Sequence, residues 1–186
     1  RDRKYIGQYF NSTEGRKLLI RATFQQAKED GVTVLEIGED VWGLKEFFHN
    51  DIDELVESFT SAQREIAPEI ELRLQIGLSR HCPISYLEDC LSYFWGNKNF
   101  YSIDLYGDEF AQPIENFKGI YRRAKKEGLR LKAHVGEWGT AKDIRTAVEE
   151  LELDEVQHGI AAAGDESVIR FLAENKIRLN ITPMSN

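Results

Sequence analysis

Short apolar runs alternate with longer amphipathic stretches along the whole chain. The apolar runs predict strands, and the stretches with hydrophobic residues on one face predict helices. Asn11 and Glu14 resemble an N-terminal cap pair for the first helix, which Gly31 ends. This alternation predicts a parallel sheet. Strands are expected at residues 32–38, 71–78, 100–105, 129–135, 156–158 and 177–181, and helices at 11–30, 51–66, 84–94, 114–127, 140–151 and 165–175.

Two parallel architectures compete for this pattern. A doubly wound sheet needs a glycine-rich phosphate turn after its first strand, but residues 38–43 are acidic and bulky. A (β/α)8 barrel of the TIM type instead places polar residues at the carboxyl ends of many strands. The chain does this at Glu39, Asp40, Arg80, His81, residues 107–109, His134, Glu137, His158, Ser185 and Asn186. The barrel is therefore favoured.

The chain is short for such a barrel. It has 186 residues and six expected strands, whereas a TIM barrel has eight strands and about 250 residues. An open parallel sheet would also leave two unpaired edges. We therefore expect one incomplete (β/α)8 barrel domain over residues 1–186, which could self-associate through its open edges. Because residue 1 is Arg1 rather than Met, we also expect that the chain does not begin where its gene does.

Composition narrows the classes of partner. A net charge of −8 argues against a general nucleic-acid or anionic-membrane binder, since both need a basic face. No apolar run approaches the roughly 18 residues of a membrane span. The two cysteines, Cys82 and Cys90, are too few for a disulfide scaffold, so a reducing, cytoplasmic location is expected.

Candidate chemistry gathers near two of the later strands. His134 and Glu137 are three residues apart at the end of one expected strand, and His158 ends the next. Two histidines and a carboxylate at neighbouring strand ends form a constellation that metal-assisted hydrolysis can use.

Four short segments at strand ends carry a family resemblance. They read IDLYGDE (103–109), AHVGE (133–137), QHG (157–159) and TPMSN (182–186). In this order they resemble the DLxGDE, HAGE, GHG and CPxSN segments of the adenosine deaminase family of metal-dependent aminohydrolases. The chain departs from those segments at Val135, Gln157 and Thr182.

The resemblance implies a role for four residues. His134 matches a metal ligand, and Glu137 matches the group that donates a proton to the purine ring. His158 matches the histidine that orients or deprotonates the metal-bound water, and Gly107 matches a backbone N–H that meets the purine. Taken without the resemblance, the two histidines could be structural, Glu137 a helix-capping or loop residue, and Gly107 a turn glycine.

Three neighbouring features stay open. Asp108 and Glu109 either hold the adjacent loop or form a solvated acidic turn. Trp138 either lines the pocket or wedges between strand and helix. Arg80 and His81 end a strand on the same side as the candidate site, with no role assigned.

The resemblance also implies missing parts. The family opens with an HxH pair on its first strand and closes with an Asp-bearing segment on its last, and neither occurs here. The chain is thus expected to hold barrel strands two to seven, without strands one and eight and without three of the four metal ligands. By itself it is expected to be inactive and to bind zinc weakly.

The expected function of the complete protein is zinc-dependent deamination of a small-molecule aminopurine nucleoside with release of ammonia. Two alternatives remain open. One is a related deaminase that acts on a nucleotide or another aminated ring. The other is a non-catalytic fragment or scaffold.

Overall fold

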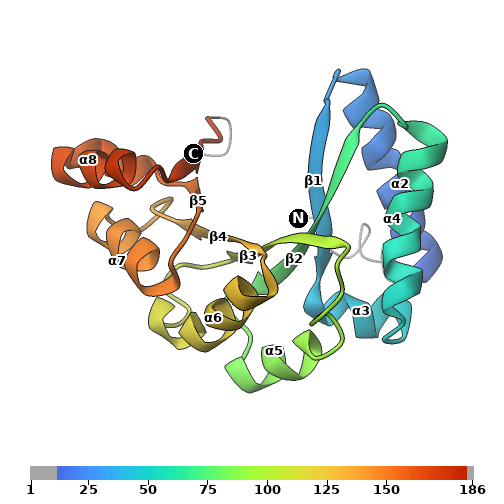
Figure 1. The fold of residues 1–186 in the computed structure, drawn as a ribbon, viewed down its shortest axis with the longest axis horizontal. Helices are drawn as coiled ribbons and strands as arrows, with labels where there is room; N and C mark the ends of the chain where they lie inside the picture. Colours follow the sequence, from blue (N-terminus) through green and yellow to red (C-terminus); the bar gives the residue numbers. More distant parts are fainter. Residues whose placement is uncertain (1–11, 184–186) are drawn as a thin grey trace, which may run out of the picture. The chain divides into compact units, whose positions relative to one another are not determined.

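A six-stranded sheet forms the framework of the computed structural model, which describes residues 12–183 (Figure 1). The strands lie side by side in chain order, and those of the second half pair in parallel. This confirms the α/β class and agrees with part of a TIM-type barrel; the assignment to barrel strands two to seven stays a prediction. The strands are β1 (Val34–Asp40), β2 (Glu71–Ser79), β3 (Phe100–Tyr106), β4 (Arg130–Val135), β5 (Glu155–His158) and β6 (Arg178–Asn180).

Helices connect the strands where the hydrophobic periodicity predicts them, with four differences. Val41–Phe48 forms a helix, α3, which the sequence analysis did not predict, and the turn after β5 is a 3-10 helix, η2. The helix expected at 114–127 is divided into η1 and α6, and that expected at 84–94 ends at Leu91. The remaining bounds are α2 (Thr13–Glu29), α4 (Ile52–Ile66), α5 (Ile84–Leu91), η1 (Ile114–Phe117), α6 (Lys118–Glu127), α7 (Ala141–Leu151), η2 (Ile160–Gly164) and α8 (Glu166–Glu174).

The chain divides into two compact units. One contains the residues up to Gln75 together with Asp89–Phe100, and the other contains Ile76–Glu88 and the chain from Tyr101 onward. The expectation of a single domain over residues 1–186 stays a prediction. No helix within residues 12–183 is long and apolar enough to cross a membrane.

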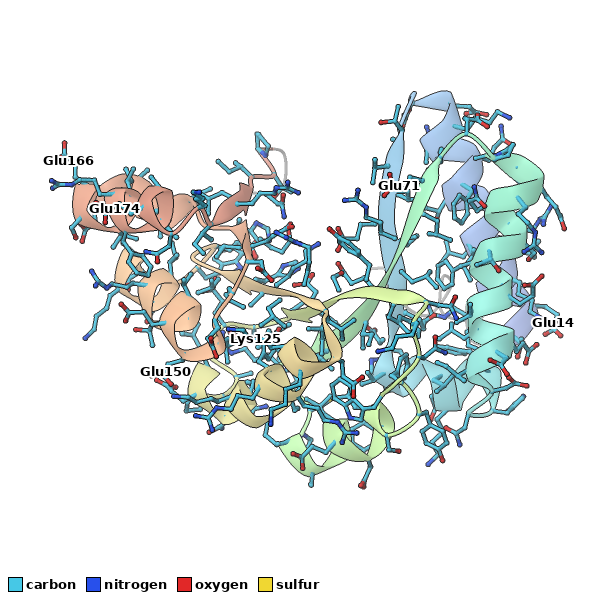
Figure 2. The ribbon with its side chains drawn as sticks, in the orientation of Figure 1. Glu14, Glu71, Lys125, Glu150, Glu166 and Glu174 are labelled. Atoms are coloured by element: carbon cyan, nitrogen blue, oxygen red, sulfur yellow. The ribbon has the colours of Figure 1, made fainter. Side chains whose placement is uncertain are left out.

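In the first unit, α2 packs against α4 around buried aromatic side chains, including Phe24 and Phe59. Ser12 begins α2 by accepting a hydrogen bond from the Gly15 N–H at 3.0 Å. The predicted cap residue Asn11 lies outside the described residues. Figure 2 shows Glu14 on the outer side of α2, where a first-turn carboxylate also suits the helix dipole.

A buried carboxylate, Glu39, lies near the carboxyl end of β1. Burial raises its pKa, and the Arg16 guanidinium, 3.6 Å away, opposes that rise in part. Arg16 in turn lies over the Phe47 ring at 4.1 Å. Glu39 therefore takes part in the packing of this unit, against α2 and α3.

The second unit has an apolar and a polar sheet face. Leu131, Ala133 and Val135 of β4 are buried, while the alternate positions Lys132 and His134 point to the opposite face. The register places Lys132 beside Asp104 of β3 and Glu155 of β5. Since all three are almost fully buried, this face contains a row of alternating charges rather than the branched aliphatic residues usual inside TIM barrels.

Glu155 is bonded to side chains of both neighbouring strands. It accepts hydrogen bonds from Arg130 at 3.0 Å and from Asn180 at 3.0 Å, and Arg178 lies 3.5 Å away. Burial raises its pKa, but the Asn180 hydrogen bond and the cations Lys132, Arg130 and Arg178 outweigh burial, so the pKa lies below its usual range. Glu155 therefore ties β4, β5 and β6 together as an ionised group.

Substituting Glu155→Gln should remove a charge-dependent part of the stability. A carboxylate with a lowered folded-state pKa stabilises above its unfolded pKa, about 4.3, and loses this effect as the pH falls through the folded value. We expect the variant to lose about 1–3 kcal/mol at pH 7 and to show a flatter stability profile below pH 5. Urea unfolding at several pH values measures both effects.

The matched control is Glu149→Gln, which removes an exposed carboxylate paired with Arg145 at 2.9 Å. It should cost less than about 0.5 kcal/mol. Equal losses in the two variants, or equal pH profiles, would contradict the role given to Glu155.

Candidate active site

Two histidines meet at the carboxyl ends of β4 and β5. The rings of His134 and His158 lie 5.2 Å apart, centroid to centroid. His158 Nε2 is 3.3 Å from Glu137 Oε2, and His134 Nε2 is 3.2 Å from Asp104 Oδ2. The structure thus brings together the three residues that the sequence singled out, and adds Asp104.

His158 is held from both sides of its ring. Its Nδ1 lies 3.1 Å from Thr182 Oγ1, opposite the contact with Glu137. Its backbone φ is +68°, which for a residue other than glycine costs roughly 1–2 kcal/mol. This departure from strand geometry occurs at the residue whose ring contacts Glu137 on one side and Thr182 on the other. The role of His158 in the candidate site stays a prediction.

Glu137 stands in a short loop whose backbone is bonded to Glu109. Glu109 Oε2 accepts the Gly136 N–H at 2.7 Å, and Oε1 accepts those of Glu137 at 2.8 Å and Trp138 at 2.9 Å. We call these three hydrogen bonds the Glu109 clamp. Glu109 is buried, and its neighbour Asp108 is exposed. Glu109 therefore holds the adjacent loop, one of the two readings that the sequence left open.

Asp108 behaves differently from Glu109. Its carboxylate accepts the Phe110 N–H at 2.8 Å, within its own turn.

Trp138 is 73% exposed, which excludes the alternative of a wedge between strand and helix.

Two glycines leave room for side chains packed against the loop between β4 and α7. Gly136 has a φ of +73°, and a Cβ there would lie 2.4 Å from Ile144 Cδ1. A Cβ on Gly139 would lie 2.8 Å from Glu109 Oε2. After Gly139, Thr140 and Asp143 form a reciprocal capping box at the start of α7. The loop between β4 and α7 is thus fixed along its whole length.

Gly107 lies in the turn after β3, close to His81. Its φ is +102°, and a Cβ there would lie 3.2 Å from His81 Cδ2. The Asp108 N–H donates to His81 Nε2 at 3.4 Å. The turn therefore needs a glycine, and its role as a contact for the purine stays a prediction.

Arg80 braces the same turn. Its backbone N–H donates to the Tyr106 carbonyl at 2.8 Å, and its Nε donates to the Gln112 carbonyl at 3.0 Å. Burial lowers the pKa of the guanidinium, whereas nearby carboxylates, Glu109 first among them, raise it. Arg80 and His81, unassigned from the sequence, thus support the segment that carries Gly107 and Glu109.

A sequence model of the adenosine deaminase family matches residues 4–186. The chain belongs to the adenosine deaminase family. A Treponema pallidum protein assigned as an adenosine/adenine deaminase is 38% identical over 90% of this chain and 56% of its own length. The adenine deaminase of Rhodospirillum rubrum is 30% identical over 90% of the chain and 51% of its own. The chain spans about half the length of the curated relatives it matches.

Solved structures confirm the fold. An adenine deaminase from Arthrobacter aurescens superposes with a TM-score of 0.78 at 23% identity, over 93% of this chain and 54% of that one. A Burkholderia ambifaria amidohydrolase with bound zinc gives a TM-score of 0.78 at 21% identity, over 91% and 48%.

Deaminases of this family depend on a metal ion, and the family resemblance predicts His134 as one of its ligands. Its imidazole is part-exposed and lies beside Asp104 and His158. However, residues 12–183 contain no group of three or more His, Cys, Asp or Glu side chains placed to hold a metal. The described residues therefore do not by themselves fit a complete metal centre, and His134 as a ligand stays a prediction.

Substituting Gly136→Ala should destabilise the loop that carries Glu137. The new Cβ meets Ile144 and the backbone must keep a positive φ, so we expect a loss of about 2–4 kcal/mol. Gly119→Ala is the matched control, because Gly119 lies in the exposed face of α6 with nothing within 4 Å of the added Cβ. This control should gain about 0.5–1 kcal/mol. Urea unfolding of both variants measures the difference, and a neutral Gly136→Ala would contradict the crowding argument.

Proposed function

We propose that this chain contributes the proton-transfer groups of a deaminase that replaces the exocyclic amine of an aminopurine with oxygen and releases ammonia. The observation that carries the proposal is the contact between Glu137 and His158 beside His134. Family membership supports it, because relatives with this fold include proteins named adenine deaminase. In this reaction water adds to the amine-bearing carbon, a ring nitrogen gains a proton, and ammonia then leaves.

Glu137 is proposed to deliver the proton to the ring nitrogen. Its side chain is 21% exposed, so it can reach a substrate, while His158, at 8%, is almost enclosed. A proton donor must lie within hydrogen-bond reach of the atom it protonates, and a positioned acid typically contributes about 10²–10⁴-fold to the rate. The imidazole of His158 holds the Glu137 carboxyl and is proposed to orient the attacking water. Gly107 is proposed to offer its backbone N–H to the purine.

We further propose that His134 supplies one ligand to a single zinc ion in the complete protein. When bound, such an ion activates water as a nucleophile near neutral pH. The other ligands would come from outside the described residues.

The proposed substrate is an aminopurine nucleoside such as adenosine. Free adenine is a second candidate, favoured by the relatives that are named adenine deaminase. A nucleotide needs cations near its phosphate. Arg80, at a strand end of the second unit, already lies among carboxylates and is poorly placed to bind a phosphate. The nucleotide alternative is therefore disfavoured.

Substituting Glu137→Gln in the full-length protein should abolish most of the activity. Ammonia release from adenosine and from adenine should fall by about 10²–10⁴-fold, because the amide cannot donate the acid proton. The control Glu149→Gln should keep the wild-type rate. A wild-type protein that releases ammonia from neither substrate would contradict the proposed function, and a fully active Glu137→Gln would contradict the role of this residue.

Substituting His134→Ala should weaken zinc binding. Loss of a direct ligand should cost more than the 10–100-fold typical of second-shell changes. The exposed His49 has a φ of +52°, so His49→Asn keeps a residue that tolerates this conformation and serves as control. Equilibrium titration with zinc measures both affinities, and equal affinities would remove His134 from the ligand set.

A further inference from the structure

We propose that Glu109 is a positioning residue for the reaction: it acts through the Glu109 clamp to place Glu137 against His158. The inference rests on the proposed function, since it concerns the same site. Glu109 is not one of the groups assigned to substrate or metal. Its two carboxylate oxygens are occupied by three backbone N–H groups of the loop that carries the proton donor.

The clamp requires a carboxylate. Three N–H groups converge on two oxygens, and an ionised carboxylate accepts on both oxygens. A glutamine in the same place would turn its own N–H2 toward at least one of these donors, so one or more of the three hydrogen bonds would be lost. Because Glu109 and the Gly136 N–H are buried, the Gly136 donor in particular could not readily find water if it were displaced.

The clamp also joins two strand ends. Glu109 is two residues beyond Gly107 in the turn after β3, and it bonds residues 136–138 after β4. Gly107 directly follows β3, so its place depends on the strand itself. Glu137 is two residues past the end of β4, so its place depends on what its loop is bonded to. Loss of the clamp should therefore move the proton donor more than the turn at Gly107.

Gly139 offers a second way to disturb the clamp without changing Glu109. A Cβ on Gly139 would lie 2.8 Å from Glu109 Oε2, the oxygen that accepts the Gly136 N–H. Gly139→Ala should push this carboxylate aside. If the inference is right, Glu109→Gln and Gly139→Ala should have the same kinetic signature.

The control is Asp165→Asn. Asp165 is also a carboxylate that accepts backbone N–H groups, from Ser167 at 2.8 Å and Val168 at 3.4 Å, at the start of α8. It has no part in the proposed site. Like Glu109→Gln, this substitution replaces a carboxylate that accepts backbone N–H groups with an amide, but it does so away from the candidate site.

The experiment measures kcat, KM, zinc content and thermal midpoint for the full-length wild type and the three variants, with adenosine and adenine. Glu109→Gln and Gly139→Ala should each lower kcat by about 10²-fold, since a displacement of about 1 Å can cost that much. KM should change by less than about threefold and zinc content should not change. Asp165→Asn should keep the wild-type kcat even where its thermal midpoint falls.

Three results would overturn the inference: a wild-type kcat in Glu109→Gln, a loss confined to KM, or a matching loss in Asp165→Asn. A wild type that deaminates neither substrate instead contradicts the proposed function. In that case, amide hydrogen exchange at Gly136, Glu137 and Trp138 tests separately whether the Glu109 clamp holds this loop. Faster exchange at these three amides in Glu109→Gln supports it, and unchanged exchange overturns it.

Discussion

Three consecutive N–H groups follow the end of β4 in buried or part-buried positions, and each needs an acceptor there. Glu109 supplies that acceptor from the neighbouring turn. At the start of α7, the backbone N–H groups of Thr140 and Asp143 are bonded in the reciprocal capping box. The loop has little freedom left, so the direction of the Glu137 side chain follows from hydrogen bonds made by its backbone. The contact between Glu137 and His158 depends on this arrangement.

The strands beneath the site bury charged side chains. Asp104, Lys132 and Glu155 lie in one row across β3, β4 and β5, where a barrel interior more often has branched aliphatic side chains. Opposite charges alternate in this row, and the bonds of Glu155 reach β6 as well. Asp104 connects the row to the site, because its carboxylate also contacts His134. Strand pairing and site geometry thus share one buried polar network.

Much of this could be predicted from the sequence. The β-branched and apolar runs locate the six strands within a few residues, and a parallel sheet brings their carboxyl ends to one edge. That rule alone places His134, Glu137 and His158 near each other. The four segments shared with the adenosine deaminase family then assign their roles, which still await experiment.

Other features depend on contacts distant in sequence. Residues 41–48 begin with bulky residues after an acidic pair, and they become helical because Val41, Leu44 and Phe48 are buried in the first unit. Asp108 and Glu109 are adjacent acidic residues, and nothing local distinguishes them. Only the fold brings a loop 27 to 29 residues away onto Glu109. The positive φ of His158 likewise cannot be predicted from the sequence.

A crystal structure of the full-length protein with a purine analogue bound would test directly whether Glu137 is the proton donor. We expect a Glu137 carboxyl oxygen to lie within hydrogen-bond reach, about 2.6–3.2 Å, of a ring nitrogen while Glu109 still accepts the three loop N–H groups. An analogue bound away from Glu137 and His158, or a loop released from Glu109 in the complex, would contradict this expectation.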